Sequence, residues 1–165
     1  MPQKHKQTCA IASALNVFGD RWTLLIIREA FYGSTRFRDF LSNTGISKNL
    51  LTDRLNKLVE DGIMERVEFS DRGTNYTYAL TKKGLALEVV IVAIQQWSDK
   101  HIYGVGNEPV LLTDHKTETR IARLQLMNTS GQPVDFSDIK YTPGPGADKY
   151  ARARINQIAS PKSEP

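Results

Sequence analysis

The sequence predicts a mainly α-helical domain that ends in a β-hairpin, followed by a small β-rich C-terminal appendix. Two observations predict this fold class. Between residues 9 and 60, four stretches carry apolar residues at the three- and four-residue spacing of helices, and capping residues or glycines separate them. Two alternating, β-prone stretches follow, IMERVEF at 63–69 and NYTYALT at 75–81, with a short polar turn between them.

The first two predicted helices lie near the start of the chain. Thr8 is positioned to cap a helix over about 9–18, which Gly19 ends. Asp20 caps the second helix, whose residues are apolar on nearly all sides. A helix with this pattern is expected to be buried in the core, and it ends at Gly33.

The third and fourth predicted helices are short and are joined by the turn NTGIS. Ser34 or Thr35 caps the third helix, whose phenylalanines turn inward. Ser47 caps the fourth helix, 47–60, whose leucines share one face while polar residues occupy the other. Gly62 is suited to the left-handed position after its end.

A long fifth helix is expected over about 82–101, with Thr81 as its cap. A surface helix needs one apolar stripe, and this sequence has two. The second stripe therefore needs a further partner to bury it. One side holds Leu85, Val89 and Val92, and the other holds Leu87, Val90, Ile91, Ile94 and Trp97.

The stretch GVGNEP at 104–109 is typical of a linker. We therefore expect one domain over 1–103 and an appendix with its tail over 110–165. In the appendix, TRIARLQLM alternates like a strand and turn-rich stretches follow it, which predicts a small β-rich structure. The last polar stretch, from Ala147, is expected to be partly helical or frayed.

The composition is that of an ordinary globular chain of 165 residues, 40% hydrophobic and 24% charged, with a net charge of +4. This mild basic excess is compatible with nucleic-acid binding and does not prove it. No apolar segment follows the basic N-terminus as in a secretory signal, and VVIVAI is far shorter than the ~20 residues of a spanning helix. The single cysteine excludes an internal disulfide framework. We expect a cytoplasmic protein.

The polar face of the 47–60 helix suits insertion into the major groove of DNA, which admits an α-helix. Asn49 is suited to bind adenine with two hydrogen bonds, and Lys48 to bind guanine or a phosphate. Asp53 would have to accept from a cytosine amino group or pair with Arg54. The predicted DNA-contacting residues of this helix are Ser47, Lys48, Asn49, Thr52, Asp53, Arg54 and Asn56.

The hairpin turn and the third helix add basic residues near this face. Arg72, beside Gly73 in the wing at 70–75, is suited to enter a minor groove or to bind phosphate. Arg36 and Arg38 are candidate contacts to the DNA backbone. The alternative is an ordinary surface helix followed by an ordinary hairpin with a solvated turn.

The motifs GDRWTLLIIRE, RFRDF, GIS, LLTDRL and YALTKKG carry a strong resemblance to the HxlR-type family of bacterial winged helix-turn-helix transcription regulators, over about 9–103. The resemblance implies a homodimer joined through the first and last helices of the domain. It also implies binding to an inverted-repeat operator, usually as a repressor and sometimes as an activator. The interface residues expected from it are Ile11, Leu15, Leu87, Val90, Ile91, Ile94 and Trp97.

The appendix resembles that of a longer subgroup, in which some relatives carry paired cysteines like a zinc ribbon. No cysteine remains here beyond Cys9, and a structural zinc site needs four closely placed ligands. We therefore expect neither a metal nor any other cofactor. The three histidines form no metal-binding or catalytic motif, and no P-loop or nucleophile motif is present, so we expect no enzyme.

Cys9 begins the first predicted helix, where unpaired N–H groups and nearby cations favour a thiolate. Some members of the family use the matching cysteine to sense electrophiles or oxidants, and the alternative is a small, half-buried apolar side chain. For Trp22 and Trp97 we favour core packing over a ligand cavity at the dimer interface.

The leading interpretation is thus a dimeric regulator that binds double-stranded DNA, with an electrophile or another small molecule as a candidate effector. Two alternatives remain open. One is a protein–protein adaptor built on the winged helix, and the other is a small-molecule-binding module without specific DNA binding.

Overall fold

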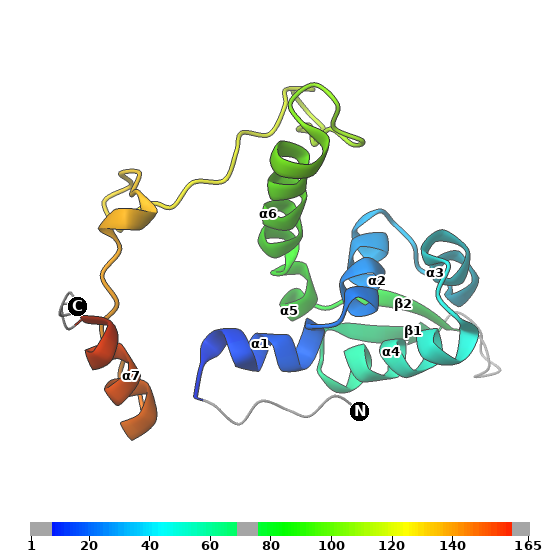
Figure 1. Cartoon of the computed structure of the whole chain (residues 1–165). Coiled ribbons are helices and arrows are strands. Elements are labelled where there is room, and N and C mark those ends of the chain that lie inside the picture. The colour runs from blue at the N-terminus through cyan, green and yellow to red at the C-terminus, as the bar shows by residue number, and fades with distance from the viewer. Residues whose placement is uncertain (1–7, 69–75, 160–165) are drawn as a thin grey trace. The chain divides into compact units, whose positions relative to one another are not determined.

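The computed structural model describes residues 8–68 and 76–159 (Figure 1). The chain divides into two compact units. One spans Val17–Leu111, and the other combines the parts of the chain up to Asn16 and from Leu112 onward. The domain boundary predicted at 104–109 stays a prediction.

The unit 17–111 contains four helices of two or more turns, a short helical turn and a two-stranded hairpin in its described part. The elements are α2 (Arg21–Phe31), α3 (Phe37–Thr44), α4 (Lys48–Glu60), β1 (Met64–Glu68), β2 (Tyr76–Leu80), α5 (Lys82–Leu85), α6 (Glu88–Ser98) and a π-helix, η1 (Asp99–Tyr103). The two strands pair antiparallel, with Met64 opposite Leu80 and Glu68 opposite Tyr76. The predicted helical domain with its hairpin is confirmed.

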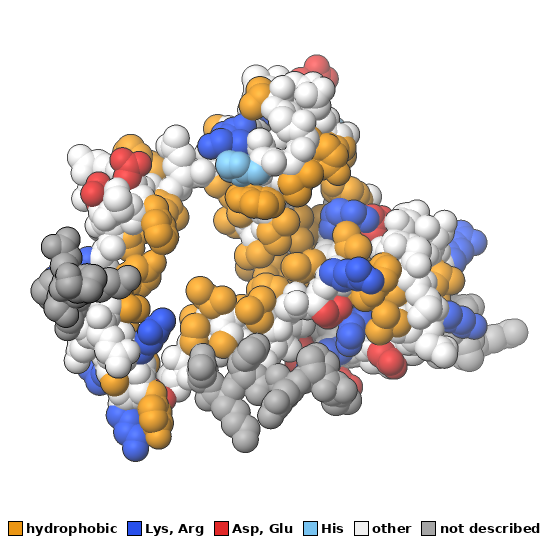
Figure 2. All heavy atoms as spheres, viewed as in Figure 1, with side chains coloured by type: hydrophobic (Ala, Val, Ile, Leu, Met, Phe, Trp, Pro, Cys, Tyr) orange, Lys and Arg blue, Asp and Glu red, His pale blue; other side chains and the backbone are white. Residues whose placement is uncertain are grey.

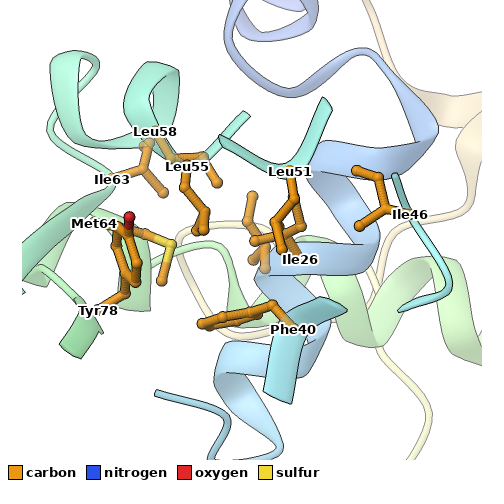
Figure 3. Close-up of a cluster of buried hydrophobic side chains, with 10 residues drawn as sticks. Ile26, Phe40, Ile46, Leu51, Leu55, Leu58, Ile63, Met64 and Tyr78 are labelled. Carbon is orange, nitrogen blue, oxygen red and sulfur yellow. The ribbon is translucent and has the colours of Figure 1, made fainter. Parts of the chain in front are cut away.

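The core of this unit forms where α2, α3 and α4 meet the hairpin. Leu51 and Leu55 of α4 are fully buried and point toward Ile26 of α2, and Phe40 of α3 lies beside them (Figure 3). Tyr78 of β2 meets the Phe40 ring edge-on, with 6.2 Å between ring centroids. Each large apolar side chain buried here contributes roughly 1.5–3 kcal/mol. The inward face of α4 therefore holds its polar face outward.

Three helix ends follow their predicted signals. The carboxylate of Asp20 accepts hydrogen bonds from the N–H groups of Trp22 and Thr23, both at 3.1 Å, and so caps α2. Gly33 and Gly62 adopt φ values of 92° and 68° after α2 and α4. These left-handed conformations cost glycine little, which explains the residue type at both positions.

One predicted cap is wrong, and a second is confirmed in its position only. α3 begins after Arg36, not after Ser34 or Thr35. The Ser34 hydroxyl is buried and donates at 3.3 Å to the carboxylate of Glu29, because a buried charge needs hydrogen-bond donors. Ser47 does occupy the N-cap of α4, but its side chain makes no capping hydrogen bond.

The long helix expected over 82–101 is interrupted. α5 ends after one turn, and α6 begins only at Glu88. Between them, Ala86 and Leu87 have ψ values of −10° and −3°, far from the value of about −42° in an α-helix. The α-helical hydrogen-bond pattern is therefore interrupted at these two residues. At its far end α6 widens into η1, a π-helix, a rare form that is frequent at functional sites.

α5 is held tightly against the start of the hairpin. The predicted cap Thr81 is confirmed, since its hydroxyl oxygen accepts from the N–H of Gly84 at 3.1 Å. Gly84 is buried, and a Cβ atom at this position would lie only 2.1 Å from the carbonyl oxygen of Ile63. Only glycine permits this close approach of two backbones.

The second unit contains α1 (Ala10–Phe18) up to Asn16, a 3-10 helix η2 (Phe136–Asp138) and α7 (Lys149–Ala159). Among its described residues, β-structure is limited to two isolated bridges, Thr113 with Arg120 and Met127 with Pro133. The appendix is therefore not β-rich. The apolar side chains of the alternating stretch 121–127 are exposed, so no packed layer supports a strand there.

Two turns in this unit are organised by single side chains. The Asp114 carboxylate accepts from the N–H groups of Lys116 at 2.7 Å and Thr117 at 2.9 Å. The Asn128 side-chain oxygen accepts from those of Ser130 at 3.0 Å and Gln132 at 2.9 Å. Each turn lies between the two residues of one isolated bridge, and the side-chain hydrogen bonds stabilise it locally.

Of the described helices, none is by itself long and apolar enough to cross a membrane, and one consecutive bent pair, α1 with α2, meets that test by length and composition alone.

Candidate nucleic-acid interface

The candidate interface is the polar face of α4 together with the start of α3. Gly45 ends α3 with φ of 68°, and the buried Ile46 anchors the turn in the core. α4 then starts at Lys48 with its leucines inward. Lys48, Asn49, Thr52 and Asp53 are all exposed on the opposite face.

Within this face, the first turn of α4 presents the side chains suited to base edges. Lys48 and Asn49 are exposed. The Thr52 hydroxyl donates to the backbone oxygen of Lys48 at 3.0 Å, so its methyl group and an acceptor lone pair remain outward. Asp53 is also exposed, on the edge of the same face.

Arg54 does not pair with Asp53, as one predicted alternative required. Its Nε lies 3.2 Å from the Asp20 carboxylate, and both side chains are about a quarter to a third exposed. The attraction of the carboxylate that caps α2 turns Arg54 toward the core of the unit. Arg54 therefore joins α4 to α2, which argues against its predicted role as a DNA contact.

Asn56 is engaged by a residue that sequence reasoning missed. Arg66 of β1 donates a hydrogen bond to the Asn56 side-chain oxygen, and its guanidinium lies 4.9 Å from the centre of the Tyr76 ring. Tyr76 in turn meets Tyr78 edge-on at 5.4 Å. This chain of contacts joins α4 to both strands. The only signal in the sequence was a basic residue in the strand that follows the helix.

Burial and the Tyr76 hydroxyl change the acidity of Tyr78 at this junction. Burial, first, and a hydrogen bond with Tyr76, second, raise the pKa of Tyr78 to about 12. The phenol therefore keeps its proton at any physiological pH, and the junction between hairpin and core stays uncharged.

The basic residues of α3 are open to solvent. Arg36 stands at the N-cap and is exposed. The Arg38 side chain is 76% exposed, with its Nε 3.5 Å from the Asp39 carboxylate. Such an exposed ion pair is weak, so Arg38 can turn to another anion at small cost. Arg72 and the wing at 70–75 lie outside the described residues.

A buried polar cluster, also missed by sequence reasoning, fixes α3 to α2. Glu29 is only 6% exposed. Its carboxylate accepts from Arg28 at 2.6 Å and from the Asn43 side chain at 3.0 Å, in addition to Ser34. A buried carboxylate persists only when it is paired in this way. The two helices that orient the candidate interface are thus locked together.

The residues expected at a dimer interface fall into two groups. Ile11 is 71% exposed, and Ile94 and Trp97 of α6 are 48% and 60% exposed. Leu87 and Ile91, in contrast, are half-buried and pack against the core of the single chain, so their place at a dimer interface stays a prediction. The break before α6 turns them inward.

The exposed apolar residues of α5 and α6 also include Leu85 and Val89, which are not among the residues expected at the dimer interface. Leu15 of α1 is exposed as well, and Val90 is half-buried. Figure 2 shows hydrophobic side chains gathered along α6. Trp97 is among these exposed residues, so the predicted core packing of Trp97 is not found within the single chain.

The other residues considered individually in the sequence are Trp22, Cys9 and the potential metal ligands. Trp22 packs partly against the core, as expected. Cys9 is exposed and not half-buried. Across the described ranges no group of three or more His, Cys, Asp or Glu side chains is arranged to hold a metal ion.

A helix–turn–helix whose second helix has an exposed polar face, followed by an antiparallel hairpin, defines a winged helix-turn-helix DNA-binding unit. Residues 17–104 match the model of the family described as HxlR-like helix-turn-helix, and the chain belongs to this family. The family consists of DNA-binding transcription regulators, not of enzymes.

Similar proteins support this assignment over most of the chain. The uncharacterised HTH-type transcriptional regulator Rv3095 of Mycobacterium tuberculosis is 34% identical over 137 residues, which cover 83% of this chain and 87% of that protein. The crystal structure of PA1607, a proposed transcription factor, superposes with a TM-score of 0.77 at 36% identity and covers 84% of this chain and 97% of its own.

The regulator YodB of Bacillus subtilis is similar to this chain over a shorter stretch. It is 35% identical over 89 residues, which cover 53% of this chain and 80% of YodB. Its reduced form superposes with a TM-score of 0.50 at 33% identity and covers 58% of this chain and 96% of the YodB chain.

Proposed function

We propose that this chain is a homodimeric repressor that inserts α4 of each protomer into the major groove of an inverted-repeat operator in the cytoplasm. The observation that carries the proposal is the polar face of α4, which is exposed from Lys48 to Asp53 and is held outward by a leucine face in the core. The repressor role, the dimer and the operator symmetry rest on the resemblance to the family.

Base recognition is assigned to Lys48, Asn49 and Thr52, with Ser47 and Asp53 at the margins of the contact. The N-terminal turn of a recognition helix lies deepest in the groove in helix-turn-helix proteins. All of these side chains are exposed, and none is used by the core. Arg54 is left out of the contact set because Asp20 holds it.

Backbone affinity is assigned to Arg36, Arg38 and the wing residue Arg72. The two arginines of α3 begin the helix that precedes the turn, where helix-turn-helix proteins meet phosphates. Asn56 and Arg66 are assigned a positioning role, since their hydrogen bond fixes the angle between α4 and the hairpin.

The first experiment tests the register of α4 on the bases. Asn49→Ala should relax the preference at one operator position by about 1–3 kcal/mol, the value of a bidentate base contact. The variant should remain folded, because alanine favours a helix more than asparagine does. Bound sites are selected from a random duplex pool, with Glu60→Ala at the exposed far end of α4 as the matched control. An unchanged sequence preference for Asn49→Ala would place the register elsewhere.

The salt dependence of binding separates a DNA-binding regulator from an adaptor. Arg38→Ala should weaken binding to all sequences alike and reduce the slope of log affinity against log salt by about 1. An adaptor that meets DNA incidentally would have a shallow slope before any substitution.

The proposed dimer uses the exposed apolar residues of α1 and α6. Ile11, Leu15, Val89 and Trp97 expose apolar surface that a single chain leaves in water. Trp97→Asp should yield monomers in light scattering, because it would bury an unpaired charge. Tyr150→Asp, an exposed aromatic of α7, is the control. A dimer that survives Trp97→Asp would exclude this face.

Cys9 is the proposed site for an electrophile or oxidant, since it is exposed. A similar solved structure, that of HypR, is described as a redox regulator, which supports an oxidant as the effector of this chain. Diamide treatment should lower the operator affinity of the wild type but not of Cys9→Ser. If both proteins respond alike, Cys9 is structural.

A further inference from the structure

A groove of about 330 Å³ lies between α2 and α6 in the unit 17–111, and the DNA contacts proposed above do not use it. The two helices contact each other and run in the same direction (Figure 1). The groove runs along the facing sides of both helices, and η1 and the segment after it complete its walls. Its volume falls in the range of pockets that bind small organic molecules.

The walls of the groove are mainly aliphatic. Leu24 and Leu25 come from α2, Ile91 and Ile94 from α6, and Val110 from the segment that follows η1. The Gln95 side chain donates to the backbone oxygen of Val110 at 3.1 Å and so ties this segment to α6. An apolar molecule would gain the free energy of burial against these walls.

Two charged side chains line the groove, Arg28 and Asp99, and in the described part of the chain only Arg28 has an oppositely charged partner. Arg28 is already engaged, with its Nη2 2.6 Å and its Nε 3.1 Å from the Glu29 carboxylate and its guanidinium 5.8 Å from the centre of the Tyr32 ring. Asp99 also lines the groove, and among the described residues no ion pair or hydrogen bond engages its carboxylate. The charge left without a partner is therefore negative.

Two further features favour a positive ligand. The last turns of α2 and of α6 with η1 both face the groove, and the C-terminal end of a helix carries partial negative charge. Tyr103 also lines the groove, and aromatic rings attract cations through their faces. η1 supplies both Asp99 and Tyr103, so the rare π-helix brings the carboxylate and a ring to the same site.

We propose that this groove binds small lipophilic organic cations. The aliphatic walls hold the apolar body, and Asp99 with Tyr103 holds the positive centre. An organic anion of the same shape would meet the Asp99 carboxylate and the two helix ends. Occupancy of the groove does not depend on the register proposed for α4, so cation binding and DNA binding can fail independently.

Two probes of the same shape and opposite charge test the proposal. Tetraphenylphosphonium and tetraphenylborate are titrated into the full chain in a calorimeter. The cation should bind more tightly than the anion by about fivefold, which is the upper end of what a partly exposed ion pair contributes. Equal binding of both ions, or binding of neither, would overturn the proposal.

Variants locate the binding. Asp99→Asn should weaken phosphonium binding about fivefold and narrow the difference between the two ions. Glu88→Gln, at the other end of α6, removes the same charge outside the groove and should change nothing. Val110→Trp fills the rim at an exposed position and should abolish binding of the cation. If phosphonium binds Asp99→Asn or Val110→Trp as it binds the wild type, the groove is not its site.

The same variants are assayed for operator binding without any probe. Their DNA affinity should equal that of the wild type, because the groove lies outside the proposed contacts. Loss of cation binding with intact DNA binding supports the groove assignment. Loss of DNA binding in Asp99→Asn would instead mean that Asp99 supports the fold, and the proposal would fall.

Discussion

Replacing Gly84 with alanine tests how tightly α5 is held against the hairpin. In an ordinary helix this substitution stabilises by about 1 kcal/mol, because alanine has the higher helix propensity. Here the added Cβ would lie 2.1 Å from the carbonyl oxygen of Ile63, whereas real contacts of this kind stay beyond 3.0 Å. The two backbones would have to part by about 1 Å.

Moving the two backbones apart should destabilise the fold by more than the higher helix propensity of alanine stabilises it. Overpacking a well-packed site costs about 1–3 kcal/mol. The same shift disturbs the hydrogen bond from the Thr81 N–H to the Ile63 oxygen at 3.0 Å and the cap from Thr81 to Gly84. Loss of a helix cap costs a further ~1 kcal/mol. The net effect should be a destabilisation of about 1–3 kcal/mol, opposite in sign to the helix propensity.

Thermal unfolding followed by tryptophan fluorescence measures this change. Both tryptophans, Trp22 and Trp97, belong to the unit 17–111, so the signal reports on the unit that contains Gly84. A unit of this size loses roughly 4–8 °C in Tm per kcal/mol. Lys82→Ala, at an exposed position of the same short helix, is the control. A Tm for Gly84→Ala equal to or above that of the wild type would refute the close-contact argument.

Three further predictions concern single side chains. Asp20→Ala should lower the free energy of unfolding in urea by about 1–2 kcal/mol, because α2 loses its cap. Tyr78→Phe should remove the tyrosine that ionises near pH 12 in an ultraviolet titration. Since the folded chain keeps that proton above the ordinary value of 10.0, stability should fall as pH rises from about 10 toward 12. The N–H of Thr117 lowers the pKa of Asp114, so the turn should be intact above the ordinary value of 3.8 and be lost as pH falls through the lower folded value. Asp114→Asn should abolish that acid transition in the amide NMR signal of Thr117.

Each of these has a contrary outcome. An unchanged urea midpoint for Asp20→Ala would mean that the Asp20 cap contributes nothing to the free energy of unfolding. A wild-type titration in which all tyrosines ionise near pH 10 would contradict the burial argument for Tyr78. An acid transition that persists at Thr117 in Asp114→Asn would assign it to another group.

Local patterns in the sequence determined most of the winged-helix unit. The spacing of Leu51, Leu55 and Leu58 identified the inner face of α4, and thereby the outer face that holds Lys48 and Asn49. The alternation of 63–69 and 75–81 identified the hairpin. These features depend on neighbours a few residues apart, so the sequence displays them directly.

The tertiary structure alone decided which long-range partners these elements meet. Arg54 pairs with Asp20, 34 residues away, and Arg66 with Asn56, 10 residues away. The angles between packed elements set both pairs, and no local pattern encodes those angles. The same applies to α6. Its two apolar sides were visible, but the break at 86–87 sets its rotation, and packing against α2 turned Ile91 inward and left Trp97 exposed. The prediction of a β-rich appendix was wrong for a similar reason. An alternating sequence forms a stable strand only when other residues pack against its apolar face. The apolar side chains at 121–127 are exposed, so no described residue packs against that face.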